Sequence, residues 1–346
     1  MRNTNYHTHT PVYSGNMETI NWNTPVKIDP ILTLPSRVML SPLEGVMRPV
    51  FCTAVKDLNL IQYWMTPFFS ISKDSVPPPA FFRKKLLPFR DSSPLIVQLL
   101  GHDPDALAEA ALRLTELQVD GINLNFACPS STVNASGNGG AILKNLPLAE
   151  KIIQTVRKAV QHKASLSVKI RCGWQDPAEI SRIAGLLNCC AVPWVICHYR
   201  TVSEQYRQVP SGWNRLKQFR DLLDPRITFF GNGDILSRHH AEQMVEQCGC
   251  HGVAVGRAFL QNPFLLKQIR DGGTICGEYG QASVLFLKTL LDVPLKHPEL
   301  ADQWSRNGFL ECCRMALGRE SPLFRQLAGM TEREIRESFA KTEEKI

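Results

Sequence analysis

The chain has 346 residues, of which 44% are hydrophobic and 21% are charged, a composition typical of a folded enzyme rather than a disordered or fibrous protein. No apolar run approaches the roughly 18 residues that a membrane-spanning helix needs, and the N-terminus has no apolar core of a signal peptide, so we expect a cytoplasmic protein. None of the eleven cysteines forms a C-x-x-C pair, which argues against zinc and iron–sulfur sites and predicts mostly free thiols in a reducing compartment.

The net charge of +7 is unevenly distributed: residues 1–90 carry +5 and residues 275–346 carry −1. Residues 82–90 interleave lysine and arginine with apolar side chains. Such a run can bind phosphates, although a solvated loop is its commoner meaning. The charge therefore permits a polyanionic partner without requiring one.

Residues 1–35 are predicted to be a polar, irregular extension. Eight short apolar runs, many of them β-branched, then alternate with amphipathic helical segments. The predicted strands are residues 38–40, 62–69, 95–100, 121–126, 167–171, 194–199, 227–231 and 252–256. Eight strands that alternate with helices predict a closed (β/α)₈ TIM barrel over residues 36–272. An open dinucleotide-binding sheet would need G-x-G-x-x-G after its first strand, where this chain has Ser-Pro-Leu-Glu-Gly.

The predicted barrel helices are residues 104–118, 148–161, 177–188 and 238–248. Asp103 and Asp176 each precede a proline in the first helical turn and are expected to be N-caps. Residues 74–94 are too rich in proline for an ordinary barrel helix and are typical of a lid or a binding insert. The pattern of residues 273–346 predicts a small C-terminal all-helical domain.

Polar side chains follow nearly every predicted strand, at the positions that line the active site in barrel enzymes. A cofactor site needs such a ring of polar groups, whereas a purely structural barrel does not. The fourth strand ends in Asn125 and Cys128. The other strands contribute Glu44, Gln98, Lys169, Arg171, His198, Arg200, Asn232, Gly233, Asp234, Gly256 and Arg257.

The turns after strands seven and eight are placed as the usual phosphate site of a barrel, where backbone N–H groups face an anion. A phosphate site together with Lys169 deeper in the mouth indicates flavin mononucleotide (FMN). The alternative for Lys169 is the Schiff-base lysine of an aldolase-like barrel. Cys128 is either a proton donor, if its pKa stays near that of a free thiol, or a nucleophile, if its pKa is lowered.

Several motifs, in this order and spacing, resemble those of the tRNA-dihydrouridine synthase family. The resemblance runs from Val38 to Leu266 and rests on SPLEGVM, VQLLG, INLNFACPSSTVNASGNGGAILK, SVKIRCGW, CHYRTVSEQY, GNGDI and GVAVGRAFLQNP. The VNASGNGGAILK form is most similar to the bacterial branch that modifies U16 of tRNA. Family members usually have methionine at position 43, glycine at position 127 and, in this branch, often glutamate at position 234, where this chain has Leu43, Ala127 and Asp234.

The resemblance implies FMN-dependent reduction of the C5–C6 bond of a tRNA uridine to dihydrouridine, with NADPH reloading the flavin. Cys128 would protonate C5 after hydride reaches C6, and the uridine would be flipped out of its stack. The uracil would contact Asn125, Arg171 and Tyr206. The flavin would be held by Pro42, Leu43, Glu44, Gln98, Lys169, His198, Asn232, Gly233, Asp234, Gly256 and Arg257.

The helical domain would dock the body of the tRNA, which favours a positive surface. Because residues 275–346 are net acidic, that surface must lie on one face, with Arg306, Arg314, Arg319 and Arg325 as candidates, or on the barrel. Two alternatives stay open: an FMN-dependent reductase of a small molecule, and a non-catalytic RNA-binding protein. We expect no metal and a monomer, although no motif reports the oligomeric state.

Overall fold

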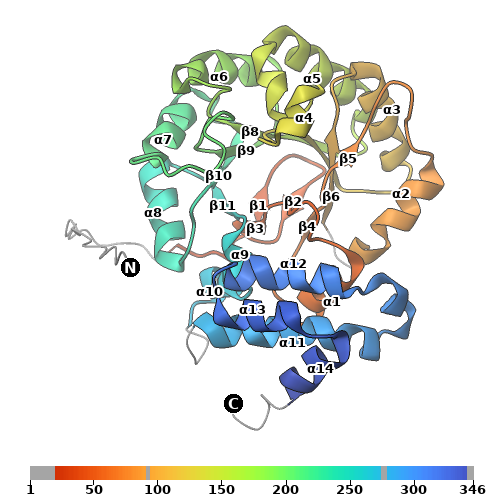
Figure 1. The fold of residues 1–346 in the computed structure, drawn as a ribbon. Helices are drawn as coiled ribbons and strands as arrows, with labels where there is room; N and C mark the ends of the chain where they lie inside the picture. Colours follow the sequence, from red (N-terminus) through yellow and green to blue (C-terminus); the bar gives the residue numbers. More distant parts are fainter. Residues whose placement is uncertain (1–19, 91–93, 274–278, 341–346) are drawn as a thin grey trace.

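The computed structural model describes residues 20–90, 94–273 and 279–340. Its main sheet is parallel, and the strands are ringed by helices (Figure 1). In hydrogen-bonded order the strands are β3 (Val38–Leu40), β11 (Gly252–Val255), β10 (Thr228–Asn232), β9 (Trp194–His198), β8 (Ser165–Arg171), β7 (Gly121–Phe126), β6 (Leu95–Leu100) and β4 (Trp64–Met65). The two end strands, β3 and β4, are neighbours, so the sheet is nearly closed. The predicted TIM barrel is confirmed.

The predicted second strand, residues 62–69, is divided into β4 and a short strand β5 (Phe69–Ser70). Both pieces pair with β6, but from Met65 to Phe69 the chain advances four residues while its partner advances three, from Ile96 to Leu99. The extra residue is a bulge, which re-aims side chains. Pro67 lies inside it and has no N–H to donate to a ladder.

The helices around the barrel begin where the sequence places its caps. The Asp103 carboxylate accepts a hydrogen bond from the backbone N–H of Ala106 at 2.8 Å, and Asp176 forms a capping box with Glu179. These helices are α1 (Pro49–Asp57), α3 (Pro104–Thr115), α4 (Ser131–Ala135), α5 (Leu146–Val160), α6 (Ile180–Cys189), α7 (Trp213–Leu222) and α8 (Arg238–Cys248), with 3₁₀ turns η2 (Gly139–Lys144) and η3 (Pro177–Glu179).

The proline-rich insert forms a helix, contrary to the sequence-based expectation. Helix α2 (Pro79–Leu86) and the 3₁₀ turn η1 (Leu87–Phe89) occupy it. The prolines cluster at the helix start, where a missing N–H costs nothing and φ is already helical. Phe82 and Leu86 then anchor the helix as fully buried side chains.

The expectation of an irregular chain up to residue 35 is also wrong for the described part of that segment. Strands β1 (Val26–Lys27) and β2 (Thr33–Leu34) form an antiparallel hairpin. Its apolar residues pack into the interior of the barrel, in a cluster of Ile28, Leu32, Leu34, Met39, Tyr63, Met65, Ile96, Trp194, Ile196, Phe230 and Ala254. The hydroxyl of Ser165, at the start of β8, donates a hydrogen bond to the Asp29 carboxylate at 2.6 Å. The hairpin therefore covers the amino-terminal end of the barrel and leaves the carboxyl end for function.

The C-terminal region is helical, as predicted, and packs below the barrel (Figure 1). Phe286 joins it to the barrel by edge contacts with Phe51 of α1 and with Phe259, at ring-centroid distances of 5.5 and 6.1 Å. The elements after the last strand are α9 (Ala258–Gln261), α10 (Leu265–Asp271), α11 (Tyr279–Lys296), η4 (Pro298–Gln303), α12 (Arg306–Leu317), α13 (Pro322–Gly329) and α14 (Glu332–Ala340).

Candidate active site

A cavity of about 790 Å³ opens at the carboxyl ends of the barrel strands. Its lining includes every residue that the sequence predicts for catalysis, cofactor binding and substrate binding. These residues are Pro42, Leu43, Glu44, Gln98, Asn125, Cys128, Lys169, Arg171, His198, Tyr206, Asn232, Gly233, Asp234, Gly256 and Arg257. The barrel thus brings together residues from seven strand ends and one loop, and the volume suits a cofactor with part of a substrate.

Cys128 lies just beyond β7, at a backbone turn held by Asn125. The Asn125 side-chain oxygen accepts hydrogen bonds from the N–H groups of Ala127 and Cys128, both at 3.0 Å. The glycine-rich loop returns against this turn, and a Cβ on Gly139 would lie 2.9 Å from Cβ of Cys128. Burial raises the pKa of the Cys128 thiol, against the opposing effects of nearby Lys169 and Arg171. The thiol is therefore protonated at neutral pH, which favours the proton donor over the nucleophile.

A chain of buried amides beneath the cavity orients Asn125. The Asn125 side-chain N–H donates to Gln98 Oε1 at 2.8 Å, and Gln98 donates to Asn123 Oδ1 at 2.7 Å. Asn123 in turn donates to the Ser167 hydroxyl at 2.8 Å. Asn123 and Ser167 were not predicted as site residues. Each lies two residues before a predicted one, so period-2 alternation along the strand is the signal that could have identified them.

Two cations and a neutral imidazole occupy the next strand ends. Burial, with a contribution from the Arg171 charge, lowers the pKa of Lys169 to about 8. Its ammonium donates to Asn232 Oδ1 at 3.4 Å. Burial and the same cations hold the pKa of His198 well below its usual value, so this imidazole is neutral at pH 7.

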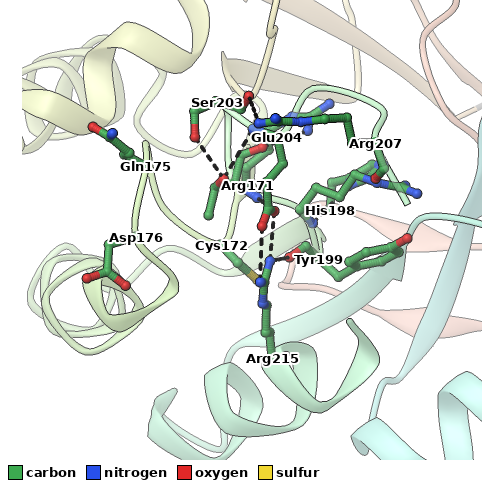
Figure 2. Close-up of polar contacts among 12 residues, drawn as sticks. Arg171, Cys172, Gln175, Asp176, His198, Tyr199, Ser203, Glu204, Arg207 and Arg215 are labelled. Atoms are coloured by element: carbon green, nitrogen blue, oxygen red, sulfur yellow. Dashed lines mark hydrogen bonds and ion pairs between the residues drawn. The ribbon is translucent and has the colours of Figure 1, made fainter. Parts of the chain in front are cut away.

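Arg171 fixes the loop that follows β9. Its guanidinium donates to the carbonyl oxygen of Ala127 at 2.8 Å and to those of Thr201 and Gln205 at 3.0 and 2.9 Å. Figure 2 shows Glu204 of this loop meeting Arg215, which lies on α7, and the closest of their contacts is 2.8 Å. The loop carrying Tyr206 is therefore tied to the barrel at two points.

A second ion pair, between Arg200 and Asp234, lies beside the same loop. Buried Arg200 donates to both Asp234 oxygens, at 2.7 and 3.1 Å, and the Tyr199 hydroxyl donates to the same carboxylate. Arg200 and the hydrogen bonds lower the pKa of Asp234 although its partial burial acts in the opposite direction. The Asp234 carboxylate is therefore ionised, and both of its oxygens already accept hydrogen bonds from protein groups. This arrangement indicates that Asp234 shapes the loop after β10.

The turns after β10 and β11 fit a phosphate group. Gly233 has a φ of +120°, a conformation that other residues rarely adopt, and a Cβ there would lie 2.6 Å from the Tyr199 ring. A Cβ on Gly256 would meet nothing within 4 Å, so its backbone is open to the cavity. The guanidinium of Arg257 lies 3.9 Å from the centroid of the Tyr206 ring and adds a positive charge. An anion could approach both turns.

The sequence missed a wall that the helical domain contributes. Arg314, Met315, Gly318 and Arg319, at the end of α12, line the same cavity. Both arginines were predicted as part of an RNA-binding face but not as part of the active site. Three of the four candidates bind within the helical domain: Arg306 donates to the carbonyl oxygen of Met330 at 2.8 Å, Arg314 pairs with Glu311, and Arg325 pairs with Glu320.

Within the described ranges, no group of three or more histidine, cysteine, aspartate or glutamate side chains could hold a metal ion. The same ranges contain no helix with the length and hydropathy of a membrane span. The ten cysteines that the structure describes are free thiols.

Comparison with protein families matches residues 39–289 to Dihydrouridine synthase (Dus). The tRNA-dihydrouridine(16) synthase of Haemophilus influenzae is 34% identical over 240 residues, which cover 68% of this chain and 77% of that protein. The protein of the same name from Vibrio vulnificus is 27% identical over 305 residues, covering 86% of this chain and 94% of its own. The Escherichia coli protein of this name is 32% identical over 239 residues, covering 68% and 75%.

Solved structures show the same architecture at low identity. Morphinone reductase aligns with a TM-score of 0.53 and 13% identity over 75% of this chain and 92% of its own. Histamine dehydrogenase from Rhizobium sp. 4-9 aligns with a TM-score of 0.54 and 12% identity over 78% of this chain and 50% of its own. Likeness at this level shows the fold alone.

The fold and the cavity define a (β/α)₈ barrel enzyme whose active site lies at the carboxyl end of the strands. The chain belongs to the dihydrouridine synthase family. The comparisons confirm the predicted family, its U16-type branch and the enzyme class.

Proposed function

We propose that this chain is an FMN-dependent enzyme that reduces the C5–C6 double bond of a uridine in tRNA, with NADPH as reductant. The observation that carries the proposal is the single cavity into which all fifteen predicted site residues converge. The names of the relatives favour uridine 16 as the target. A cytoplasmic, monomeric enzyme that docks tRNA through residues 273–346 completes the proposal.

The residues present fit FMN. The turns at Gly233 and Gly256, with Arg257, would hold its phosphate. Gln98, Lys169, His198 and Asn232, together with Pro42, Leu43 and Glu44, would hold the rest of the flavin. Asp234 would act indirectly, by shaping the phosphate turn. When bound, FMN would supply the hydride that uridine reduction needs.

The chain itself supplies the proton and the orientation of the base. Cys128, kept protonated by burial, would give its Sγ proton to C5 of the uracil. Asn125 holds the backbone of Cys128 and, with Arg171 and Tyr206, would position the uracil ring. A base stacked in RNA cannot reach this depth, so the uridine must be flipped into the cavity.

The test is the absorbance spectrum of the purified protein, followed by NADPH turnover with unmodified tRNA and mapping of dihydrouridine. Bound FMN and dihydrouridine at one position would support the proposal and identify the position. Flavin without an RNA product would favour a small-molecule reductase. Protein that binds tRNA but neither purifies with flavin nor takes it up on reconstitution would favour a non-catalytic RNA-binding role.

A further inference from the structure

A second cavity, of about 410 Å³, lies directly beside the active site. The two cavities share Glu44 and Phe68, the latter placed by the bulge between β4 and β5. Residues of β5 and α2 contribute to the lining of the second cavity. Helix α2 lies on the outside of the barrel (Figure 1). Its lining is Glu44, Met47, Thr66, Pro67, Phe68, Phe69, Ser70, Pro77, Phe81, Lys85 and Phe89.

Aromatic rings dominate the wall that α2 and β5 form. Phe69, Phe81 and Phe82 contact each other edge to face, with ring centroids 5.3 to 6.3 Å apart. Phe82 is fully buried and anchors the helix, whereas Phe81 is 40% exposed. Burial of Phe82 anchors α2, and Phe81 leaves part of its ring exposed beside the cavity.

A cation lies over this exposed ring. The Lys85 ammonium is 5.8 Å from the centroid of Phe81, and both residues line the cavity. The helix that carries both residues has no acidic residue in its first turn. Flat aromatic faces with adjacent lysine and arginine are the features by which proteins bind unstacked nucleotides: the base stacks on the ring and the phosphate meets the cation.

We propose that this cavity is a subsite for a nucleotide next to the target uridine, whose base stacks on Phe81 while Lys85 contacts the backbone phosphate. The inference rests on the proposed function. Flipping one uridine unstacks its neighbours, which stay covalently attached within one nucleotide of the active site. The second cavity shares Glu44 and Phe68 with the active-site cavity, so it lies within reach of such a neighbouring nucleotide. The base and phosphates of a dinucleotide reductant have similar chemistry, so the test separates the two ligands.

The test compares Phe81→Leu, Phe81→Trp and Lys85→Gln. The control is Lys84→Gln, at a neighbouring exposed lysine that is not one of the described residues lining the cavity. Affinity is measured by fluorescence anisotropy of a labelled, unmodified tRNA transcript. Phe81→Leu removes the flat face but keeps apolar contact with Phe69 and Phe82, and should weaken RNA binding about five- to fiftyfold. Phe81→Trp should retain wild-type affinity.

Lys85→Gln should weaken binding about three- to tenfold and reduce the slope of log affinity against log salt by about one, whereas Lys84→Gln should do neither. The rate of flavin reduction by NADPH without RNA should be the same in all variants. Slower flavin reduction with unchanged RNA affinity would overturn the inference in favour of the reductant. Unchanged RNA affinity in Phe81→Leu and Lys85→Gln, with dihydrouridine formed by the wild type, would reject this subsite alone. Wild-type protein that forms no dihydrouridine would instead reject the proposed function.

Discussion

Replacing Lys169 with methionine should stabilise the flavin-free protein while impairing its function. Burial and Arg171 lower the pKa of Lys169 from 10.5 to about 8, so the folded state disfavours the charged ammonium. At roughly 1.4 kcal/mol per pKa unit, the cost is about 3 kcal/mol at neutral pH. Loss of the 3.4 Å hydrogen bond to Asn232 offsets about 1 kcal/mol. We therefore expect Lys169→Met to raise the free energy of unfolding by about 2 kcal/mol.

The sign of the pH dependence follows from proton binding. Between pH 8 and about 10.5 the unfolded wild-type chain holds the Lys169 proton while the folded chain has released it, so wild-type stability rises with pH across this window. The methionine variant has no such group. Its advantage should be complete below pH 8 and should have largely vanished at pH 10.5.

Thermal unfolding of the flavin-free proteins measures this difference. A gain of about 2 kcal/mol should raise the midpoint by roughly 2–4 °C at pH 7 for a chain of this length, and the gain should narrow markedly at pH 10. Lys163→Met, at an exposed lysine just before β8, is the matched control and should shift the midpoint little at either pH. The Lys169→Met protein should also retain less flavin than the wild type. A Lys169→Met protein no more stable than the wild type, or one whose advantage persists at pH 10.5, would refute the reasoning.

Three further changes test the site and the fold. Cys128→Ala should keep its flavin but form dihydrouridine about 10²- to 10⁴-fold more slowly. The control Cys189→Ala, at an exposed thiol, should match the wild type. A fully active Cys128→Ala would remove the proton-donor assignment. Arg257→Ala should weaken FMN binding about tenfold or more in a fluorescence titration, and unchanged affinity would count against the phosphate site. Asp103→Ala should lower the free energy of unfolding by about 1 kcal/mol because α3 loses its N-cap, and turnover at 25 °C should be retained. An unchanged midpoint of thermal unfolding would show that the cap does not stabilise the fold.

The sequence predicted the barrel mouth well because parallel strands share one polarity. Once strand ends are located, Lys169 and Arg257, which are 88 positions apart, must face one opening whatever the connecting helices do. Helix N-caps such as Asp103 depend on neighbouring residues alone, so they could also be predicted from the sequence.

Two of the three failures concern features that no local pattern encodes. The wall at Arg314 and Arg319 depends on how the helical domain docks against the barrel, which the Phe51–Phe259–Phe286 packing determines. The hairpin of β1 and β2 has strands of two residues each, too short for periodicity to register. Helix α2 was missed because proline was judged by its abundance rather than by its position at the helix start.

The docking of the helical domain also explains how a net acidic segment can serve an enzyme of RNA. Several acidic side chains in the described part of this segment are paired along the helices, where Arg333 pairs with Glu337 at 2.8 Å and Arg336 with Glu332 at 3.0 Å. Charges paired at such distances largely cancel beyond about 10 Å at moderate salt. What a phosphate senses on approach is the local field. At the opening Lys169, Arg171, Arg257 and Arg319 outnumber the carboxylates of Glu44 and Asp234, and Asp234 is paired with Arg200. The net charge of residues 275–346 is therefore a poor guide to RNA affinity, and the arrangement of cations around the mouth is the relevant quantity.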